Sequence, residues 1–264
     1  MRDAAGSPRA LLRELAREYL RFSRLNARAW QRVVSVSVSM SLWLIAAIIA
    51  MSWYGVARAR INRYMFWTFL TYFLYSEPVW AAAEARSSLR GGVAEQILAA
   101  RGGLASVLLP WLLVDSSIWS SVDSAMLLAI FALIFGGTPR LEQPLLFAAA
   151  LPPLMAFSLA VGVAAVYLMN MTENTWVVGL ALQLVVPLMG GIIPPTALPK
   201  EIAHALLLSP LQYVIAPPIY AGTGMWPLDP VIVLTTDYIL SIISIILIFK
   251  IDKIAKYYLY LLSR

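Results

Sequence analysis

The chain has 264 residues, of which 61% are hydrophobic and only 13% charged, and its mean hydropathy is +0.77. Soluble domains hold about 45–50% apolar and about 25% charged residues, so this composition predicts an all-α polytopic membrane protein in the cell membrane. The absence of cysteine excludes disulfides, thiolate metal sites and cysteine nucleophiles. The net charge of +6 is explained by the positive-inside rule rather than by nucleic-acid binding.

Residues 1–32 are predicted to form a cytosolic, basic connecting helix that lies along the inner membrane surface. Between residues 8 and 32, apolar side chains recur at helical spacing while arginines occupy the opposite face. The two sets are Leu12, Leu15, Tyr19 and Phe22, and Arg13, Arg17, Arg21, Arg24 and Arg28. This helix would serve either as a topology anchor for the first span or as a docking element for a cytosolic partner.

Six apolar runs predict a transmembrane domain of six helices over residues 33–249, followed by a basic cytosolic tail at 250–264. The expected spans are 33–56, 64–83, one within 104–135, 145–167, 176–193 and 228–249. With both termini cytosolic, the inner segments hold 15 of the 20 Lys and Arg residues, and this bias sets the orientation. The exception is an expected external turn that carries Arg58, Arg60 and Arg63.

Two connections stand out in this arrangement. A polar cytosolic loop spans residues 84–103 and is bounded by glycine pairs. The external segment 190–227 is too apolar for a solvated loop, yet Gly190, Gly191, Pro194 and Pro195 prevent a continuous helix. Because broken helix at membrane depth survives only inside protein or against a watery cavity, we expect an external re-entrant segment before the sixth span.

Four carboxylates lie in or near the predicted spans: Glu77, Asp115, Asp123 and Asp237. Buried acids in membranes are costly and are functional candidates by default. Asp115 and Asp123 lie among serines, whose hydroxyls can satisfy them through hydrogen bonds between helices. Both a structural role and an ion-pathway role therefore remain open.

The residues needed for catalysis or nucleotide binding are missing. The only histidine is His204, and no Gly-Lys pair exists from which a phosphate-binding Walker loop could be built. We therefore expect no enzyme activity and no catalytic, cofactor-binding or metal site on this chain.

The order of parts resembles the membrane subunit of the type-2 permease family of ABC transporters, which export drugs, lipids and polysaccharides. The family's cytosolic loop has a glutamate followed by Gly-Thr-Leu-Glu-x-Leu-Leu and a proline. Here Glu84 precedes a run from Gly92 to Leu98, in which Val93 replaces the threonine and Arg101 stands near the expected proline. The family's external signature is matched by Gly191, Pro194, Leu198, Pro199, the short helix 202–208, Pro210 and Tyr213.

The resemblance implies a half-transporter that binds no cofactor itself, with ATP and Mg²⁺ held on a separate ATPase. Its partners would be two ABC ATPase copies, a second permease copy or a homologous permease, and membrane lipids. The candidate ATPase-coupling residues are Glu84, Gly92, Glu95, Ile97, Leu98 and Arg101. The candidate external gate residues are Gly190, Gly191, Pro194, Pro195, Pro199, Pro210 and Tyr213.

The predicted function is thus ATP-driven export, and the apolar, aromatic-rich spans would suit an amphipathic or lipid-like substrate. Two alternatives remain. One is a secondary transporter driven by an ion gradient, with Asp115, Asp123 or Asp237 as the ion site. The other is a membrane scaffold that transports nothing.

Overall fold

The computed structural model describes residues 58–88, 105–172, 174–192 and 200–262, and every regular element within these ranges is a helix. The prediction of an all-α chain is confirmed for this part. The expected connecting helix at 8–32 and the expected first span at 33–56 lie outside the described residues, as does most of the 84–103 loop.

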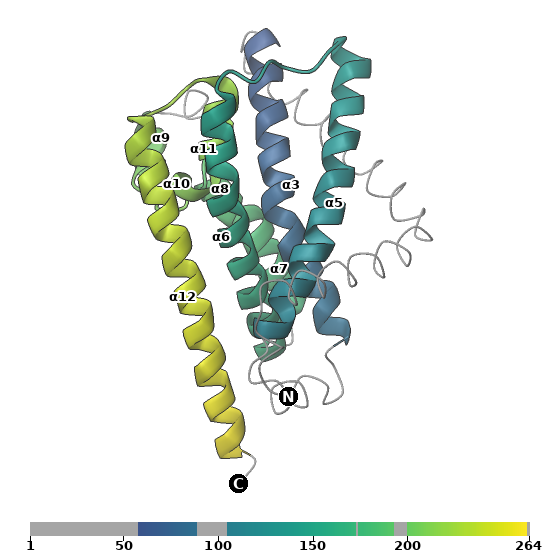
Figure 1. Cartoon of the computed structure of the whole chain (residues 1–264), viewed down its shortest axis with the longest axis vertical. Coiled ribbons are helices and arrows are strands. Elements are labelled where there is room, and N and C mark those ends of the chain that lie inside the picture. The colour runs from purple at the N-terminus through teal and green to yellow at the C-terminus, as the bar shows by residue number, and fades with distance from the viewer. Residues whose placement is uncertain (1–57, 89–104, 173, 193–199, 263–264) are drawn as a thin grey trace, which may run out of the picture.

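Four long helices of the described residues lie side by side, and α5 runs in the opposite direction to the other three (Figure 1). They are α3 (Arg58–Ser88), α5 (Ala105–Phe135), α6 (Pro144–Met171) and α12 (Pro230–Leu262). Within the described residues, three stretches are long and apolar enough to cross a membrane: Leu108–Leu133, Pro144–Met171 and Pro230–Ile251. Helix α3 equals α5 in length, but its many tyrosines and tryptophans and Glu77 lower its hydropathy.

The predicted fifth span is shorter than expected. It consists of α7 (Thr175–Leu180), the π-helix η1 (Ala181–Val185) and α8 (Val186–Met189), and the whole piece runs Thr175–Met189. A membrane crossing needs about 20 helical residues, so this piece is too short to span a bilayer alone. Three short helices follow: α9 (Lys200–Leu207), α10 (Gln212–Ile215) and α11 (Pro217–Thr223).

One sequence-based boundary was wrong. Arg58, Arg60 and Arg63 do not form a turn between spans, because α3 begins at Arg58. The sixth span, expected at 228–249, corresponds to the candidate membrane span Pro230–Ile251, and α12 continues beyond it to Leu262 through the basic tail. Nothing in residues 250–262 breaks a helix, since this stretch contains neither glycine nor proline.

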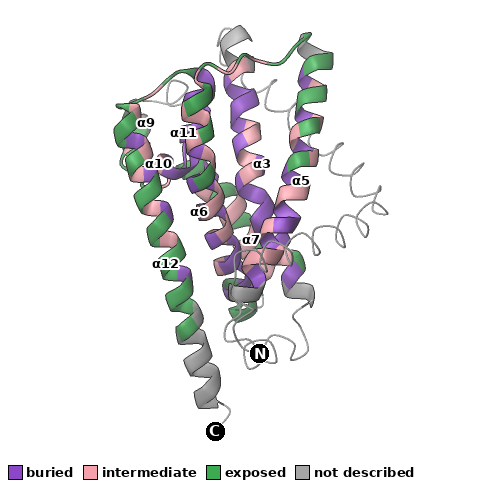
Figure 2. Ribbon diagram, in the orientation of Figure 1, coloured by how far each residue is buried: buried purple, intermediate pink, exposed green. Residues whose placement is uncertain are grey.

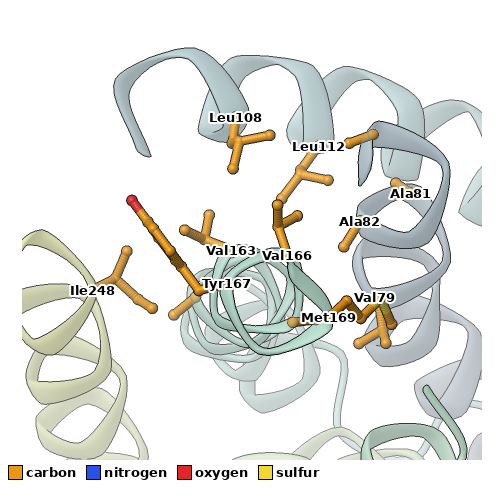
Figure 3. Packing of buried hydrophobic residues seen from close by; sticks show 13 residues of the cluster. Val79, Ala81, Ala82, Leu108, Leu112, Val163, Val166, Tyr167, Met169 and Ile248 are labelled. Atoms are coloured by element: carbon orange, nitrogen blue, oxygen red, sulfur yellow. The ribbon is translucent and has the colours of Figure 1, made fainter. Parts of the chain in front are cut away.

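Helix α6 is the centre of the bundle, with α3 and α5 on one side and α12 on the other. Its contacts with α3 and α5 include Val79, Leu112, Val163 and Val166 (Figure 3). Helices α6 and α3 approach closely at Gly162, where a Cβ would lie 2.7 Å from the carbonyl oxygen of Pro78. Small residues at such crossings bring membrane helices into van der Waals contact, which stabilises a bundle in lipid.

Helix α12 has only a narrow buried stripe, at Val233, Asp237, Ser241 and Ile248. Most of the other residues between Pro230 and Ile251 are exposed, and most of these are isoleucine, leucine or valine (Figure 2). In a soluble protein such an apolar face would drive association. On a helix of membrane-spanning length it has the character of a surface that faces lipid.

Candidate functional site at the broken segment

The broken segment lies at one end of the bundle, which we call the outer end. This end holds the start of α3, the connection 136–143 between α5 and α6, and the connection 224–229 that leads to α12 (Figure 1). The predicted topology makes it external. The opposite, inner end holds the end of α3 and the start of α5, which flank the unplaced loop at 89–104.

Hydroxyl groups on one face of α3 hold the broken segment in place. Tyr64 donates to the carbonyl oxygen of Gly191 at 3.1 Å, and Thr68, one turn further on, donates to that of Ile192 at 3.4 Å. These carbonyls follow the end of α8, where no further turn of helix supplies N–H donors. Side chains four residues apart share a helix face, so α3 presents both hydroxyls to the same stretch of backbone.

Tyr75 continues this face and satisfies a carbonyl group in the π-helix. In an α-helix the carbonyl of Leu182 would accept from the N–H of Val186, but that N–H donates to Ala181 instead. With π spacing the donor would be Pro187, which has no N–H. The Tyr75 hydroxyl supplies the missing bond, 2.8 Å from the Leu182 oxygen.

Helices α10 and α11 are packed into the bundle rather than spread over its surface. All seven residues of α11 are buried, and α11 contacts both α3 and α6. At Gly222 a Cβ would come within 2.3 Å of the Trp67 ring, and at Gly190 one would come within 2.5 Å of Ile215. The absence of a side chain at these glycines therefore allows α11 to pack closely against α3, and the turn after α8 to pack closely against α10.

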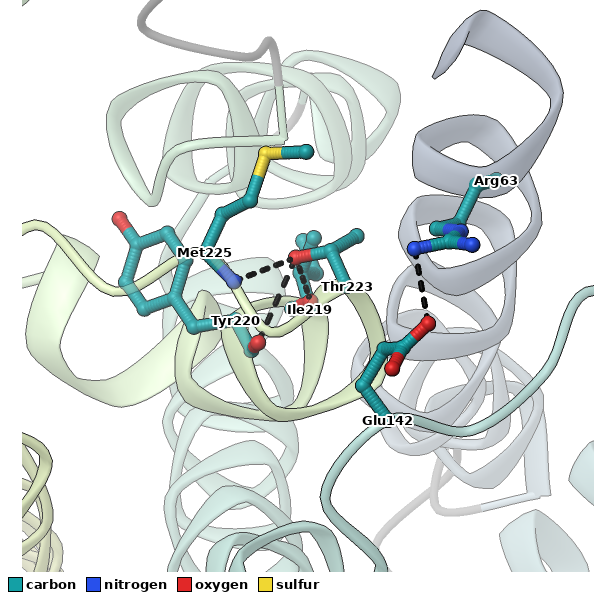
Figure 4. Close-up of polar contacts among 6 residues, drawn as sticks. All are labelled: Arg63, Glu142, Ile219, Tyr220, Thr223 and Met225. Carbon is teal, nitrogen blue, oxygen red and sulfur yellow. Dashed lines mark hydrogen bonds and ion pairs between the residues drawn. The ribbon is translucent and has the colours of Figure 1, made fainter. Parts of the chain in front are cut away.

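A clasp joins three parts of the outer end, consisting of Arg63, Glu142, Gln143 and Trp226. Arg63 of α3 forms a 2.8 Å ion pair with Glu142 in the 136–143 connection (Figure 4). The backbone N–H of Gln143 donates to Ala221 at the end of α11 at 3.1 Å, and the Trp226 indole donates to the Gln143 side chain. The clasp ties α3, the α5–α6 connection and the broken segment together.

Four of the predicted gate residues lie in the described part of the structure. Gly190 and Gly191 form the turn after α8, and Gly191 adopts φ 81°, a conformation that favours glycine. Pro210 is exposed, and the Tyr213 hydroxyl donates to the carbonyl of Leu207 at 3.0 Å, which caps α9. Three further candidates lie outside the described residues: Pro194, Pro195 and Pro199.

Of the predicted coupling residues only Glu84 lies in the described part. It is exposed near the end of α3, at the inner end and far from the broken segment (Figure 1). The other five lie outside the described residues: Gly92, Glu95, Ile97, Leu98 and Arg101. The structure therefore places Glu84 and the described gate residues at opposite ends of the bundle.

All four predicted intramembrane acids are buried: Glu77, Asp115, Asp123 and Asp237. They lie on α3, α5 and α12, and within the described residues no three acids or histidines gather in a way that could hold a metal ion. Asp237 is 0% exposed, and neither of its oxygens accepts a hydrogen bond from a described residue. The hydroxyl of Ser241, one turn along α12, donates to the carbonyl of Pro153 at 2.9 Å instead.

The polar face of α3 is the feature that sequence reasoning missed. Most of the aromatic residues of α3 are buried, whereas Trp80 is exposed. The signal was present in the spacing: Tyr64, Thr68, Thr71 and Tyr75 recur every three or four residues and carry hydroxyls. Thr71 is fully buried, and its hydroxyl has no partner among the described residues.

Comparison with known proteins adds no further constraint: no family model, curated protein or solved structure matches this chain.

Proposed function

We propose that this chain is the membrane-spanning permease subunit of an ABC-type exporter, which moves a substrate outward across the cell membrane while a separate ATPase subunit hydrolyses ATP. The observation that supports this most is the placement of α10 and α11. This part of the broken segment is interrupted by prolines and is packed into the outer end of a helical bundle. At membrane depth, irregular backbone is tolerated only where it is buried in protein or lines a water-filled cavity, as in the broken helices of transporters.

Helix α3 provides a physical link between the two ends. At the outer end Tyr64 and Thr68 bond the backbone that follows α8, and α3 then runs 31 residues to Ser88. The loop that leaves Ser88 carries the sequence that resembles an ATPase-coupling helix. A rigid-body displacement of this loop would move α3 as a rod and pull its hydroxyls away from the broken segment.

A second function, ion-coupled transport, is favoured by Asp237. A carboxylate that is 0% exposed is expensive as an anion, so it would exchange protons or bind a cation only in a conformation that admits water. Transport that continues without ATP but stops when the ion gradient is collapsed would select this function.

The test is purification of the tagged chain in mild detergent from its own host, followed by an assay of Mg²⁺-dependent ATP hydrolysis and of ATP-driven transport after reconstitution. We expect an ATPase subunit to co-elute. Glu95→Gln should reduce transport per ATP hydrolysed, whereas Glu201→Gln at the outer end should not. A preparation with no ATPase activity in several detergents would overturn the proposal.

A further inference from the structure

Asp237 lies on the face of α12 that packs into the bundle. It is 0% exposed, and the buried residues Val233 and Ser241, one turn away on either side, share its face. Helices α6 and α10 both pack on α12, and Leu240 contacts the apolar cluster to which α10 contributes Val214 (Figure 1). The turn of α12 that holds Asp237 is therefore covered by α6 and by α10 of the broken segment.

The helices that pack on α12 supply no positive charge to an ionised Asp237. Helices α5, α6, α10 and α11 contain no lysine, arginine or histidine. On α12 itself the first lysine is Lys250, about 20 Å further along the helix axis. The other titratable groups in these elements are tyrosines, which are uncharged at neutral pH, and further acids. They are Tyr167, Tyr213, Tyr220 and Tyr238, and Asp115, Asp123, Asp229 and Asp252.

The hydroxyl groups next to Asp237 direct their hydrogens to α6. Ser241 donates to the carbonyl oxygen of Pro153 at 2.9 Å, and Tyr238 donates to that of Ala149 at 3.0 Å. Because a hydroxyl has a single hydrogen, Ser241 presents only lone pairs to a carboxyl group on its own face. A carboxylic acid could donate to such an oxygen, whereas a carboxylate would gain nothing from it.

A proton also suits this place better than a metal cation does. Cations such as calcium are held by about 6–8 oxygen ligands. The buried stripe of α12 contributes one carboxyl group and one hydroxyl, from Asp237 and Ser241. The carbonyl oxygens of Ala149 and Pro153 opposite this turn already accept hydrogen bonds.

We infer that Asp237 binds a proton in this packed conformation, and that α10 shields this proton from exchange with water. Burial among helices without a cation makes the anion costly, and the acid form removes that cost. Because α10 belongs to the broken segment, displacement of the segment would admit water to the carboxyl group. The inference requires neither ATP hydrolysis nor an ion gradient, so it and the proposed export function can fail separately.

Infrared spectroscopy of the purified full chain tests the protonation state. The carbonyl stretch of a carboxylic acid lies apart from the bands of a carboxylate, so the difference between the wild type and Asp237→Asn isolates this side chain. At neutral pH we expect Asp237→Asn to lose an acid carbonyl band. The control is Asp229→Asn, which should lose carboxylate bands, because Asp229 is exposed and accepts from the N–H of Val231 at 2.7 Å. Loss of carboxylate bands in Asp237→Asn would overturn the inference.

Deuterium exchange tests whether α10 covers the proton. The acid carbonyl band shifts when deuterium replaces the proton, so the rate of this shift in heavy water measures the access of water to Asp237. Val214→Ala, which removes two buried methyl groups from α10, should raise the rate roughly 10-fold. Val166→Ala removes the same groups from the cluster between α3, α5 and α6, and should leave the rate unchanged. Equal rates in the two variants would show that α10 does not shield the proton.

Discussion

The hydroxyl of Tyr238 on α12 donates to the carbonyl oxygen of Ala149 on α6 at 3.0 Å. Ala149 is the residue whose carbonyl would accept the N–H of residue 153, which is a proline. Similarly, the Tyr75 hydroxyl donates to the carbonyl oxygen of Leu182, which in a π-helix would accept from residue 187, a proline. In both places a tyrosine from a neighbouring helix replaces a hydrogen bond that proline removes, as backbone in lipid requires.

Removal of these hydroxyls should therefore destabilise the bundle although no hydrocarbon contact is lost. Tyr75→Phe leaves a buried carbonyl without a donor, and we expect it to lower the free energy of unfolding by about 1–2 kcal/mol. Tyr72→Phe is the control, since the Tyr72 hydroxyl makes no hydrogen bond within the described residues. Unfolding of both variants in mixed micelles by increasing sodium dodecyl sulfate measures the difference, and equal stabilities would contradict the assigned role of Tyr75.

Gly222 should tolerate no side chain while Trp67 is present. A methyl group there would come within 2.3 Å of the indole, and overpacking of this kind costs about 1–3 kcal/mol. We expect Gly222→Ala to lower the unfolding temperature, and Gly137→Ala, which has open space around it, to leave it unchanged. Trp67→Leu should make the alanine at 222 less costly, and purely additive effects in this double-mutant cycle would show that the two residues do not meet.

Gly162→Ala should be more damaging, at about 2–3 kcal/mol, because the atom in its way is a backbone oxygen rather than a side chain. The carbonyl of Pro78 belongs to the interior of α3 and cannot rotate aside. Gly179→Ala is the matched control, since the nearest atom to its Cβ would be the flexible end of the Met169 side chain at 3.6 Å. Alanine also favours a helix over glycine by about 1 kcal/mol. In detergent, the unfolding temperature of Gly162→Ala should be well below that of Gly179→Ala.

Much of the helical framework could be predicted from apolar run length. The spans expected within 104–135 and at 145–167 correspond to α5 and α6, and the short helix at 202–208 corresponds to α9. Helix α6 continues through Pro152 and Pro153, and the Tyr238 hydroxyl donates to the carbonyl oxygen of Ala149 that Pro153 leaves without an N–H. The length of an apolar run can be read directly from the sequence without knowledge of tertiary contacts, which explains why these elements were predictable.

The contacts of the site were not predictable in the same way. The hydrogen bond from Tyr75 to Leu182 joins residues 107 positions apart, and its acceptor is available only because the fifth apolar run forms a π-helix before Pro187. Hydropathy does not distinguish that run from a regular span, which is why a full crossing at 176–193 was expected. The distances that place α11 against Trp67 likewise depend on packing rather than on local pattern.

The orientation of the bundle predicts opposite labelling of its two ends. His204 on α9 and Glu84 near the end of α3 are both exposed, and the chain contains no other thiol to react. In intact cells His204→Cys should react with a membrane-impermeant maleimide, whereas Glu84→Cys should react only after the membrane is permeabilised. If Glu84→Cys reacted in intact cells and His204→Cys only after permeabilisation, the broken segment would face the cytosol, and the proposed orientation would be wrong.

Transport should require the outer clasp to open. Arg63 and Glu142 are partly exposed, so their ion pair contributes about 1 kcal/mol at most, and its disruption alone should change stability little. A covalent bridge is a stronger constraint. In the variant Arg63→Cys/Glu142→Cys, a short bifunctional thiol reagent with a cleavable spacer can join two positions whose native side chains already meet, without the close Cα spacing that a disulfide needs.

We expect this bridge to stop substrate movement in reconstituted vesicles and reduction of the spacer to restore it, because α3 would be unable to separate from the α5–α6 connection. The single variants Arg63→Cys and Glu142→Cys, treated with the same reagent, are the controls for modification without a bridge. If the bridged protein transports at the rate of these controls, the outer end does not open between α3 and residues 136–143. The substrate path would then have to lie elsewhere. The hydrogen bonds of Tyr64 and Thr68 to the broken segment would stabilise the fold and would not need to break during transport.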